Sequence, residues 1–361
     1  MPASEPLRYE LLDRALERGL APDGLLRLGS LYGARARERA ESRGGVESQA
    51  ERLRALVARM SSGPVAESVE AANAQHYELP AEFLGLILGP RRKYSGCLWP
   101  WPEGSDRGSL AEAEEAMLEL SCERAGIEDG MRVLDLGCGW GSLTLWLAER
   151  YPAGTVVGVS NSGSQREWIL GEAARRGLSN VSVVTADVNE FGAGGMESPF
   201  HRVMSIEMFE HMRNWRELLR RISTWLTPDG RAFVHVFSHR TLPYLFTGTW
   251  ASARFFTAGL MPSHDLMLHF QDDMVVREQW AIGGTHYART LQAWLARLDG
   301  SLEEAIEVLH GSGGWSQREA RRLVATWRLF LISTEMIWGY RGGDRWLVSH
   351  YLLEPRPQRS V

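Results

Sequence analysis

The segment Val133–Leu136, followed by Gly137, Gly139 and Gly141, constrains the fold more than any other part of the chain. A short apolar run leads into a glycine-rich turn and then into an apolar helix-type sequence, SLTLWLAERY. Glycines at such a turn let the backbone approach a ligand closely, and the following helix presents free N–H groups. Because a strand and a helix flank the glycines, we interpret this segment as a nucleotide-binding turn and not as a surface turn.

Strand-like and helix-like segments alternate from residue 109 onward. The expected strands are short β-branched runs bounded by Gly, Asn or Asp, namely RVLDLG, TVVGVS, VSVVTADV, HRVMSIEMF, RAFVHVF and WLVSHYLL. This alternation predicts an α/β fold with a mostly parallel, doubly wound sheet. An aromatic-rich stretch follows Ser238, and we expect an insertion at about residues 240–330 to cover the sheet edge where ligands bind.

The 361 residues allow such a domain, at 108–361, with two additions before it. Leu and Ala recur at three- and four-residue spacing in residues 1–64, which predicts a helical N-terminal arm. This pattern favours packing or dimerisation over a substrate-capping role, and both stay open. Residues 65–107 crowd prolines and aromatics in HYELP and YSGCLWPWPEG, so we expect a lid or linker there.

Composition excludes several classes of protein. With 44% hydrophobic and 24% charged residues, the chain is not disordered or fibrous, and its net charge of −5 disfavours a nucleic-acid partner. Cys97, Cys122 and Cys138 form no disulfide framework and no ligand set, so we expect no metal site and a reducing compartment. No apolar run approaches the ~18 residues of a membrane span, which predicts a cytoplasmic protein.

The second and third strands end in residues that suit an adenosine-containing ligand. The second strand ends at Ser160, where dinucleotide sites place an acid, and the loop through Asn161 to Gln165 supplies hydroxyls and amides for a ribose. The third strand leads to Asp187 and Val188, a carboxylate for an exocyclic amine and an apolar side chain for a purine face. A simple turn role for Asp187 is the alternative.

Several ordered motifs carry a family resemblance from about residue 70 to the end. They are HYELP, YSGCLWP, VLDLGCGWGSLTLWLAERYP, GVSNSGSQ, FEHM, HYARTLQAWL and WLVSHYLL. Together they resemble the cyclopropane fatty acid synthase superfamily of S-adenosylmethionine-dependent methyltransferases, and within it coclaurine N-methyltransferase-like enzymes. The resemblance implies a Rossmann-type class I methyltransferase fold, S-adenosylmethionine as cofactor and S-adenosylhomocysteine as product.

The resemblance also implies where the cofactor lies. The matched pairs are Tyr94 and Ser95 at the methionine moiety, Gly137 and Gly139 beneath it, Ser160 and Gln165 at the ribose, and Asp187 and Val188 beside the adenine. Asp135, in the strand before the glycines, belongs to the same candidate site. A ribose bound by a serine and a glutamine explains why the acid is missing after the second strand.

Glu207, Glu210 and His211 form the strongest chemical constellation in the chain. Strand geometry would separate the two carboxylates, so we expect a helical turn that brings both acids and the imidazole to one face. Such groups can take a proton from an amine, and the resemblance places them at the substrate nitrogen, so we predict that they are catalytic. Acids that merely suit a helix dipole are the alternative.

Two residues separate this chain from the lipid-modifying synthases, which bind bicarbonate. Gly96 stands where the synthases have a cysteine, and Glu207 where they have a glycine, while His235 and Tyr287 match bicarbonate residues. An added anion suits a cationic amine, so we predict N-methylation of a small aromatic or cyclic amine. The alternative is a cyclopropane synthase-like enzyme or a lipid C-methyltransferase that acts on unsaturated acyl chains. A membrane partner is expected only under this alternative.

The substrate pocket is the least determined part of the site. Most tryptophans are expected in the core, but the resemblance favours Tyr77, Trp327 and Phe330 as pocket walls, together with His235 and Tyr287. Residues 250–262 depart from the family pattern, so the sequence does not identify the amine. A homodimer is possible, and a cofactor-binding protein without catalysis is a third, disfavoured hypothesis.

Overall fold

A seven-stranded sheet forms the centre of the computed structural model, which describes residues 16, 20–67, 79–102, 108–192, 199–255 and 259–357. The strand order is β3-β2-β1-β4-β5-β9-β8. The strands are β1 (Arg132–Leu136), β2 (Thr155–Ser160), β3 (Val181–Thr185), β4 (Phe200–Ile206), β5 (Leu226–His239), β8 (Met274–Gly283) and β9 (Trp346–Pro355). The first five in the chain are parallel, and β9 runs antiparallel to both β5 and β8. The predicted α/β, mostly parallel Rossmann-type fold is therefore confirmed.

Strand β8 was not expected, and it lies inside the predicted insertion of residues 240–330. Its sequence, MVVREQWAIG, places exposed Arg277 and Glu278 in mid-strand, and its ladder is irregular between Val276 and Glu278. An edge strand pairs on one side only and tolerates such polar residues, so it lacks the apolar run that reveals a central strand. The insertion is thus not one continuous cap, because β8 belongs to the main sheet.

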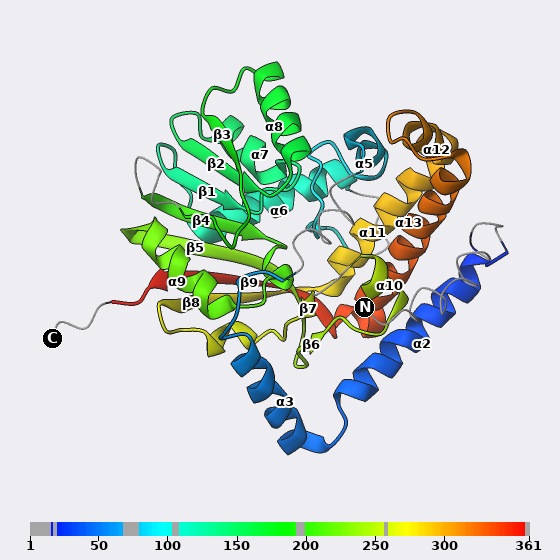
Figure 1. The fold of residues 1–361 in the computed structure, drawn as a ribbon, viewed down its shortest axis with the longest axis horizontal. Helices are drawn as coiled ribbons and strands as arrows, with labels where there is room; N and C mark the ends of the chain where they lie inside the picture. Colours follow the sequence, from blue (N-terminus) through cyan, green and yellow to red (C-terminus); the bar gives the residue numbers. More distant parts are fainter. Residues whose placement is uncertain are drawn as a thin grey trace.

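The two faces of the sheet are covered by different helices (Figure 1). Helices α6 (Leu110–Ala125) and α7 (Ser142–Arg150) pack against a cluster containing Val133 and Val156, whereas α9 (Trp215–Trp225) packs against Leu134 and Val157. Successive side chains of a strand point to opposite faces, so each strand contributes to both layers. Helix α8 (Gly163–Arg175) covers the end of the sheet near β3.

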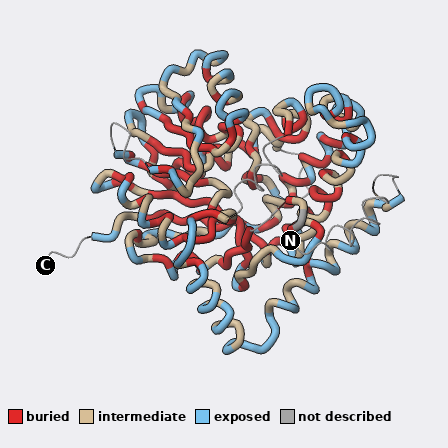
Figure 2. The backbone as a smooth tube through the Cα atoms, in the orientation of Figure 1, coloured by how far each residue is buried: buried red, intermediate tan, exposed pale blue. Residues whose placement is uncertain are grey.

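A second, helical lobe lies beside the sheet (Figure 1). It consists of α5 (Ala81–Ile87), α11 (Gly284–Gly300), α12 (Leu302–Gly311) and α13 (Gln317–Trp338), which share one apolar cluster. Shorter elements join it to the sheet: η2 (Phe209–His211), β6 (Tyr244–Leu245), α10 (Trp250–Arg254), β7 (Leu260–Met261), η3 (Leu266–His269) and η4 (Tyr340–Gly343). Figure 2 shows buried residues concentrated in the sheet and between these helices.

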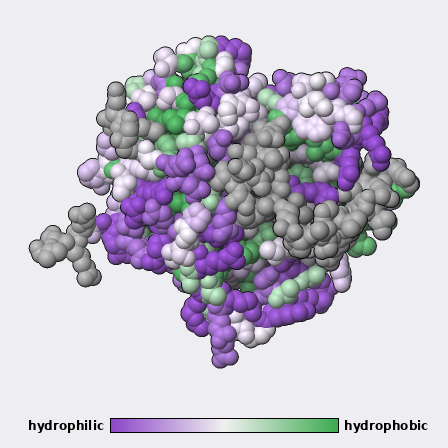
Figure 3. All heavy atoms as spheres, viewed as in Figure 1, coloured by the Kyte–Doolittle hydropathy of each residue, from purple (hydrophilic) through white to green (hydrophobic). Residues whose placement is uncertain are grey.

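The N-terminal arm contains α2 (Asp23–Glu41) and α3 (Gly45–Arg59). Helix α2 lies along α13 and is joined to it by ion pairs, Asp23 with Arg328 at 2.7 Å and Arg27 with Glu335 at 2.5 Å. Helix α3 has no buried residue, and hydrophilic side chains gather over it on the face that Figure 3 shows. Within the described ranges, no helix combines the length and apolar character that crossing a bilayer requires.

Gly284 allows α11 to begin against β9, which places Tyr287, one turn later, at the site described below. A Cβ atom at position 284 would collide with the backbone oxygens of Trp338 and Trp346. We therefore expect Gly284→Ala to lower the free energy of unfolding by about 1–3 kcal/mol, measured by urea denaturation. Gly300→Ala, at the other end of the helix, meets no atom within 4 Å and should leave stability unchanged or slightly higher. Equal stability of the two variants would contradict this.

Candidate active site

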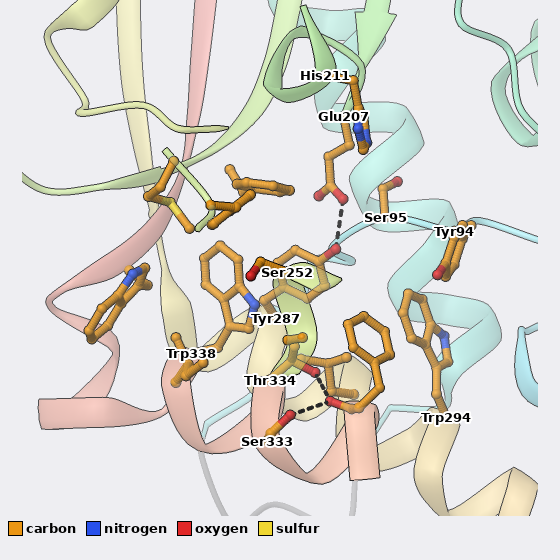
Figure 4. A pocket seen from close by; sticks show the side chains of 18 of the residues that line it. Tyr94, Ser95, Glu207, His211, Ser252, Tyr287, Trp294, Ser333, Thr334 and Trp338 are labelled. Atoms are coloured by element: carbon orange, nitrogen blue, oxygen red, sulfur yellow. Dashed lines mark hydrogen bonds between the residues drawn. The ribbon is translucent and has the colours of Figure 1, made fainter. Parts of the chain in front are cut away.

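A cavity of about 640 Å³ lies between the carboxyl end of the sheet and the helical lobe. Its walls come from the turn after β1, the end of β4, residues 92–95, and helices α2, α11 and α13. Figure 4 shows Glu207 and His211 at one end of this cavity, and Ser333 and Thr334 of α13 at the other. The site thus combines the ligand-binding edge of an open α/β sheet with a helical enclosure.

The cofactor side of the cavity contains five of the predicted residues: Tyr94, Ser95, Asp135, Gly137 and Gly139. Gly139 has φ 52°, and an added Cβ there would meet no atom within 4 Å, so its backbone is open to a ligand. At Gly137, with φ 84°, a Cβ would come within 2.8 Å of Met208 Cγ. Both positions therefore need glycine, one for conformation and one also for space.

The remaining predicted cofactor residues lie at the ends of β2 and β3, outside the cavity lining. Ser160 Oγ donates to Gln165 Oε1 at 2.6 Å, which leaves Gln165 Nε2 buried and without a hydrogen-bond partner. Trp140 Nε1 and Ser142 Oγ are likewise buried and unpartnered, and both residues line the cavity. Buried polar atoms normally have partners, so these three fit a polar ligand such as S-adenosylmethionine.

Asn161, Asp187 and Val188 are each half-buried on the same rim. The Asp187 carboxylate accepts the N–H of Asn189 at 2.7 Å. The turn role that the sequence left open for Asp187 is therefore realised, and its contact with the adenine stays a prediction. Asp135 is buried, accepts the Thr144 hydroxyl at 2.6 Å, and has its pKa raised to about 6 by burial.

The Glu207 carboxylate is held by three donors from three separate segments. Its Oε1 accepts the Gly96 N–H at 3.0 Å and pairs with His235 Nε2 at 3.2 Å, while Oε2 accepts the Tyr287 hydroxyl at 2.6 Å. These are the positions that the resemblance assigns to bicarbonate binding in the synthases. The Glu207 side chain thus puts a carboxylate among residues that match an anion site.

Glu207 also has an unusual backbone, with φ 48°. This left-handed conformation favours glycine, the residue that the synthases carry at this position, and costs a glutamate roughly 1–2 kcal/mol. The helical turn expected to start at Glu207 does not form there, because the η2 helix begins only at Phe209. The three donors on the carboxylate oppose this backbone cost.

Glu210 needs a correction, because it does not share the face that Glu207 presents to the cavity. Its side chain is fully buried, and its Oε1 accepts the Phe237 N–H at 2.9 Å. Of the three predicted catalytic residues, the described cavity lining contains Glu207 and His211 only. The reason is the positive φ of Glu207, which breaks the i, i+3 relation that one continuous helix would have given.

Burial acts on the carboxyl groups of both Glu207 and Glu210, and the charge of Glu207 also acts on Glu210. Burial raises the pKa of Glu210 well above its ordinary value, and the Glu207 charge raises it further. Burial also raises the pKa of Glu207, but Lys93, the Gly96 N–H and Tyr287 oppose that rise. Glu210 is therefore the member that keeps a proton, and Glu207 the member that ionises first.

Lys93 is buried beside this pair and is the only lysine of the chain. Its Nζ donates to Ser95 Oγ at 2.5 Å and to the Gly96 carbonyl at 2.7 Å, and burial lowers its pKa. The lysine thereby fixes the loop that supplies both Tyr94 and the Gly96 donor. Neither composition nor motif spacing indicated this role.

The predicted substrate residues divide into three groups. Tyr287 and Phe330 line the cavity, whereas Trp327 is core and His235 lies buried behind Glu207. Tyr77 lies outside the described residues. Trp294 and Trp338 also line the cavity. Sequence reasoning counted Trp338 among several aromatics that could form a pocket wall without favouring it, and it missed Trp294, because nothing in the local sequence separates either from a core tryptophan.

Helix α2 of the N-terminal arm forms one wall of the cavity. Leu26, Ser30, Gly33 and Ala34 face it, at the three- and four-residue spacing of one helix side. Arg37 continues this side and donates to the Thr247 carbonyl at 3.0 Å. Helix α2 thus lies where the capping role would require it.

The fold, the glycine turn and the unpartnered polar atoms define the class of this protein, an S-adenosylmethionine-dependent methyltransferase. Residues 66–330 match the family described as mycolic acid cyclopropane synthetase, and the chain belongs to that family. The predicted family, enzyme class and cofactor are therefore confirmed.

The chain is also similar to individual proteins of known activity or structure. The chain is 38% identical to (S)-coclaurine N-methyltransferase of Thalictrum flavum subsp. glaucum over 96% of both chains. It is similar to the crystal structure of coclaurine N-methyltransferase bound to N-methylheliamine and SAH, with a TM-score of 0.90, 36% identity, and coverage of 96% of this chain and 99% of that one. A cyclopropane synthase from Mycobacterium tuberculosis shares the fold, with a TM-score of 0.64 at 23% identity over 81% of this chain and 99% of that one.

The unpartnered amide nitrogen of Gln165 gives a test of the cofactor site. We expect Gln165→Leu to weaken S-adenosylhomocysteine binding about five- to tenfold in isothermal titration, because one hydrogen bond to the ligand is lost. Gln49→Leu is the control: the Gln49 amide, on α3, donates to the Ser42 carbonyl and does not line the cavity, so this variant should bind S-adenosylhomocysteine normally. If the two variants bind S-adenosylhomocysteine with equal affinity, the Gln165 amide does not bind its ribose.

Proposed function

We propose that this protein transfers a methyl group to the nitrogen of a small aromatic or cyclic amine. The observation that carries the proposal is the Glu207 carboxylate in the cavity wall. An ionised carboxylate has about four lone-pair sites, and three are filled by Gly96, His235 and Tyr287. The fourth, on Oε2, is available to an amine N–H, and the similarity to coclaurine N-methyltransferases supports this substrate class.

S-adenosylmethionine supplies an electrophilic methyl group on a sulfonium. The chain's own residues must then present the amine unprotonated, since an ammonium has no lone pair. Glu207 receives the N–H and takes its proton, while His211, which also lines the cavity, is the second group able to hold one. Neutral Glu210 lies behind them, so the ionised carboxylate faces no second buried anion.

The walls of the cavity suit a flat, partly apolar substrate. Tyr287 and Trp338 stack with ring centroids 4.4 Å apart, and Phe330 and Trp294 extend the aromatic lining. Aromatic faces attract a methylated ammonium product by cation–π interaction. Ser333 and Thr334 hydroxyls donate to the Phe330 carbonyl at the far end, where a substrate hydroxyl can pair with their oxygens.

The reaction class is tested by measuring S-adenosylhomocysteine release with primary, secondary and tertiary amines, beside vesicles of unsaturated phospholipid. We expect turnover with amines only, because the Glu207 carboxylate lies among the residues that match the synthases' bicarbonate site. Product from the vesicles alone would overturn the proposal in favour of acyl-chain chemistry.

Glu207→Gln tests the role of the carboxylate. We expect turnover of the best amine to fall about 10²–10⁴-fold, because an amide cannot take the proton. Glu217→Gln is the matched control, since that carboxylate pairs with Arg220 and Arg221 on the surface of α9 and should leave turnover unchanged. Less than a threefold difference between the variants would remove Glu207 from the mechanism.

Gly33→Leu tests the arm as a specificity wall. A Cβ at position 33 meets no atom within 4 Å, and leucine favours a helix, so the side chain is accommodated at the expense of cavity space. We expect KM for bulky amines to rise about tenfold while small amines are little affected. Arg35→Leu adds the same side chain at a position of α2 that does not line the cavity, so it should leave KM unchanged for both bulky and small amines.

A further inference from the structure

A row of hydrogen bonds leads from the Glu207 carboxylate across the sheet to α6. His235 Nε2 lies 3.2 Å from Glu207 Oε1, and His235 Nδ1 lies 2.9 Å from His350 Nε2. His350 Nδ1 in turn lies 2.8 Å from Arg124 Nη1. The two histidines are opposite each other in the β5–β9 ladder and are fully buried. Arg124 lies in the last turn of α6.

The direction of donation along this row follows from Arg124. A guanidinium can only donate, so His350 Nδ1 must accept, and a neutral His350 must carry its proton on Nε2. That proton is donated to His235 Nδ1, which leaves the His235 proton on Nε2, facing Glu207. Burial lowers the pKa of both histidines well below its ordinary value, so each ring carries one proton.

We propose that Arg124 is a positioning residue for methyl transfer, which acts through His350 and His235 to keep an N–H donor aimed at Glu207. The inference rests on the proposed function of Glu207 as the group that receives the amine proton. Arg124 itself does not line the cavity and contacts no reacting atom. Its contribution is to select one of the two tautomers that each neutral imidazole could adopt.

Without the guanidinium, the direction of hydrogen-bond donation between His350 and His235 could reverse. His350 could then carry its proton on Nδ1, His235 would donate to His350, and the bare His235 Nε2 would face Glu207. That arrangement needs Glu207 to be protonated and to donate to His235 Nε2. A protonated Glu207 cannot take the proton of the amine, so the arrangement favours an inactive enzyme. The other charged or titratable groups around Glu207 are Lys93, Cys97, Glu210, His211 and Tyr287. Glu123 lies beside Arg124, and none of these groups is altered by a substitution at position 124.

The tautomers can be observed directly by nitrogen NMR of the full chain labelled at histidine. We expect both His235 and His350 as the Nε2–H tautomer, with their signals assigned from single histidine substitutions. In Arg124→Met, at least one of them should change partly or wholly to Nδ1–H. The proposal would be overturned if either histidine carried its proton on Nδ1 in the unaltered protein, or if neither tautomer changed in Arg124→Met. This test does not depend on the identity of the substrate.

The pH dependence of kcat/KM gives the functional readout. In Arg124→Met we expect the acid limb to move to higher pH by about one unit, because protonated Glu207 is favoured, with turnover recovering at alkaline pH. Arg124→Lys should restore the original limb, since an ammonium also only donates. A uniform loss at every pH, or no rescue by lysine, would show a merely structural role and overturn the proposal.

Trp280→Leu is the matched control. The Arg124 guanidinium lies 4.8 Å from the centroid of the Trp280 ring, so this variant removes the packing contact and keeps the donor. We expect its acid limb to stay in place. A shift equal to that of Arg124→Met would assign the effect to packing instead of donor direction. If no amine is turned over, the proposed function fails. The NMR result would still show whether Arg124 sets the tautomers of His350 and His235.

Discussion

The structure depends on holding one nearly buried carboxylate, that of Glu207, among hydrogen-bond partners from three separate segments. An isolated buried carboxylate costs several kcal/mol, and hydrogen-bond donors must offset that cost. The donors at Gly96, His235 and Tyr287 lie 111, 28 and 80 residues away in sequence. They meet only because the loop before α6, the centre of the sheet and the first turn of α11 converge at the end of β4. The docking of the helical lobe on the sheet is therefore a requirement of the site as well as of the core.

The same convergence explains how the cavity is enclosed. Helix α11 brings Tyr287 to Glu207 and carries Trp294 on the same side, while α13 contributes Phe330 and Trp338. Helix α2 then covers the outer side and is held to α13 by ion pairs at Asp23 and Arg27. Apolar contacts add to these ion pairs, because Ala34 is buried in the cluster of the helical lobe and Leu26 packs against it.

Local sequence was sufficient where local geometry decides the structure. The glycine turn after β1 and the six strands with apolar runs could be predicted because each depends on residues adjacent in the chain. The class of cofactor came from the family resemblance, which is carried by several motifs along the chain. Strand β8 could not be predicted, since its stability comes from the β9 ladder and not from its own apolar content. The left-handed φ of Glu207 likewise carries no local signal, because glutamate rarely adopts it.

The sequence by itself thus determined the fold class, the cofactor turn and the group of residues from which the catalytic acid is drawn. Only the tertiary structure decided which glutamate faces the cavity and that His235 contacts Glu207 from behind. It also decided that Trp327 lies in the core, and that Phe330 and helix α2 line the cavity. The physical reason is the separation along the chain between interacting residues. A turn or a strand is specified by neighbours within a few residues, whereas the exposure and protonation of a buried side chain are set by partners dozens to hundreds of positions away.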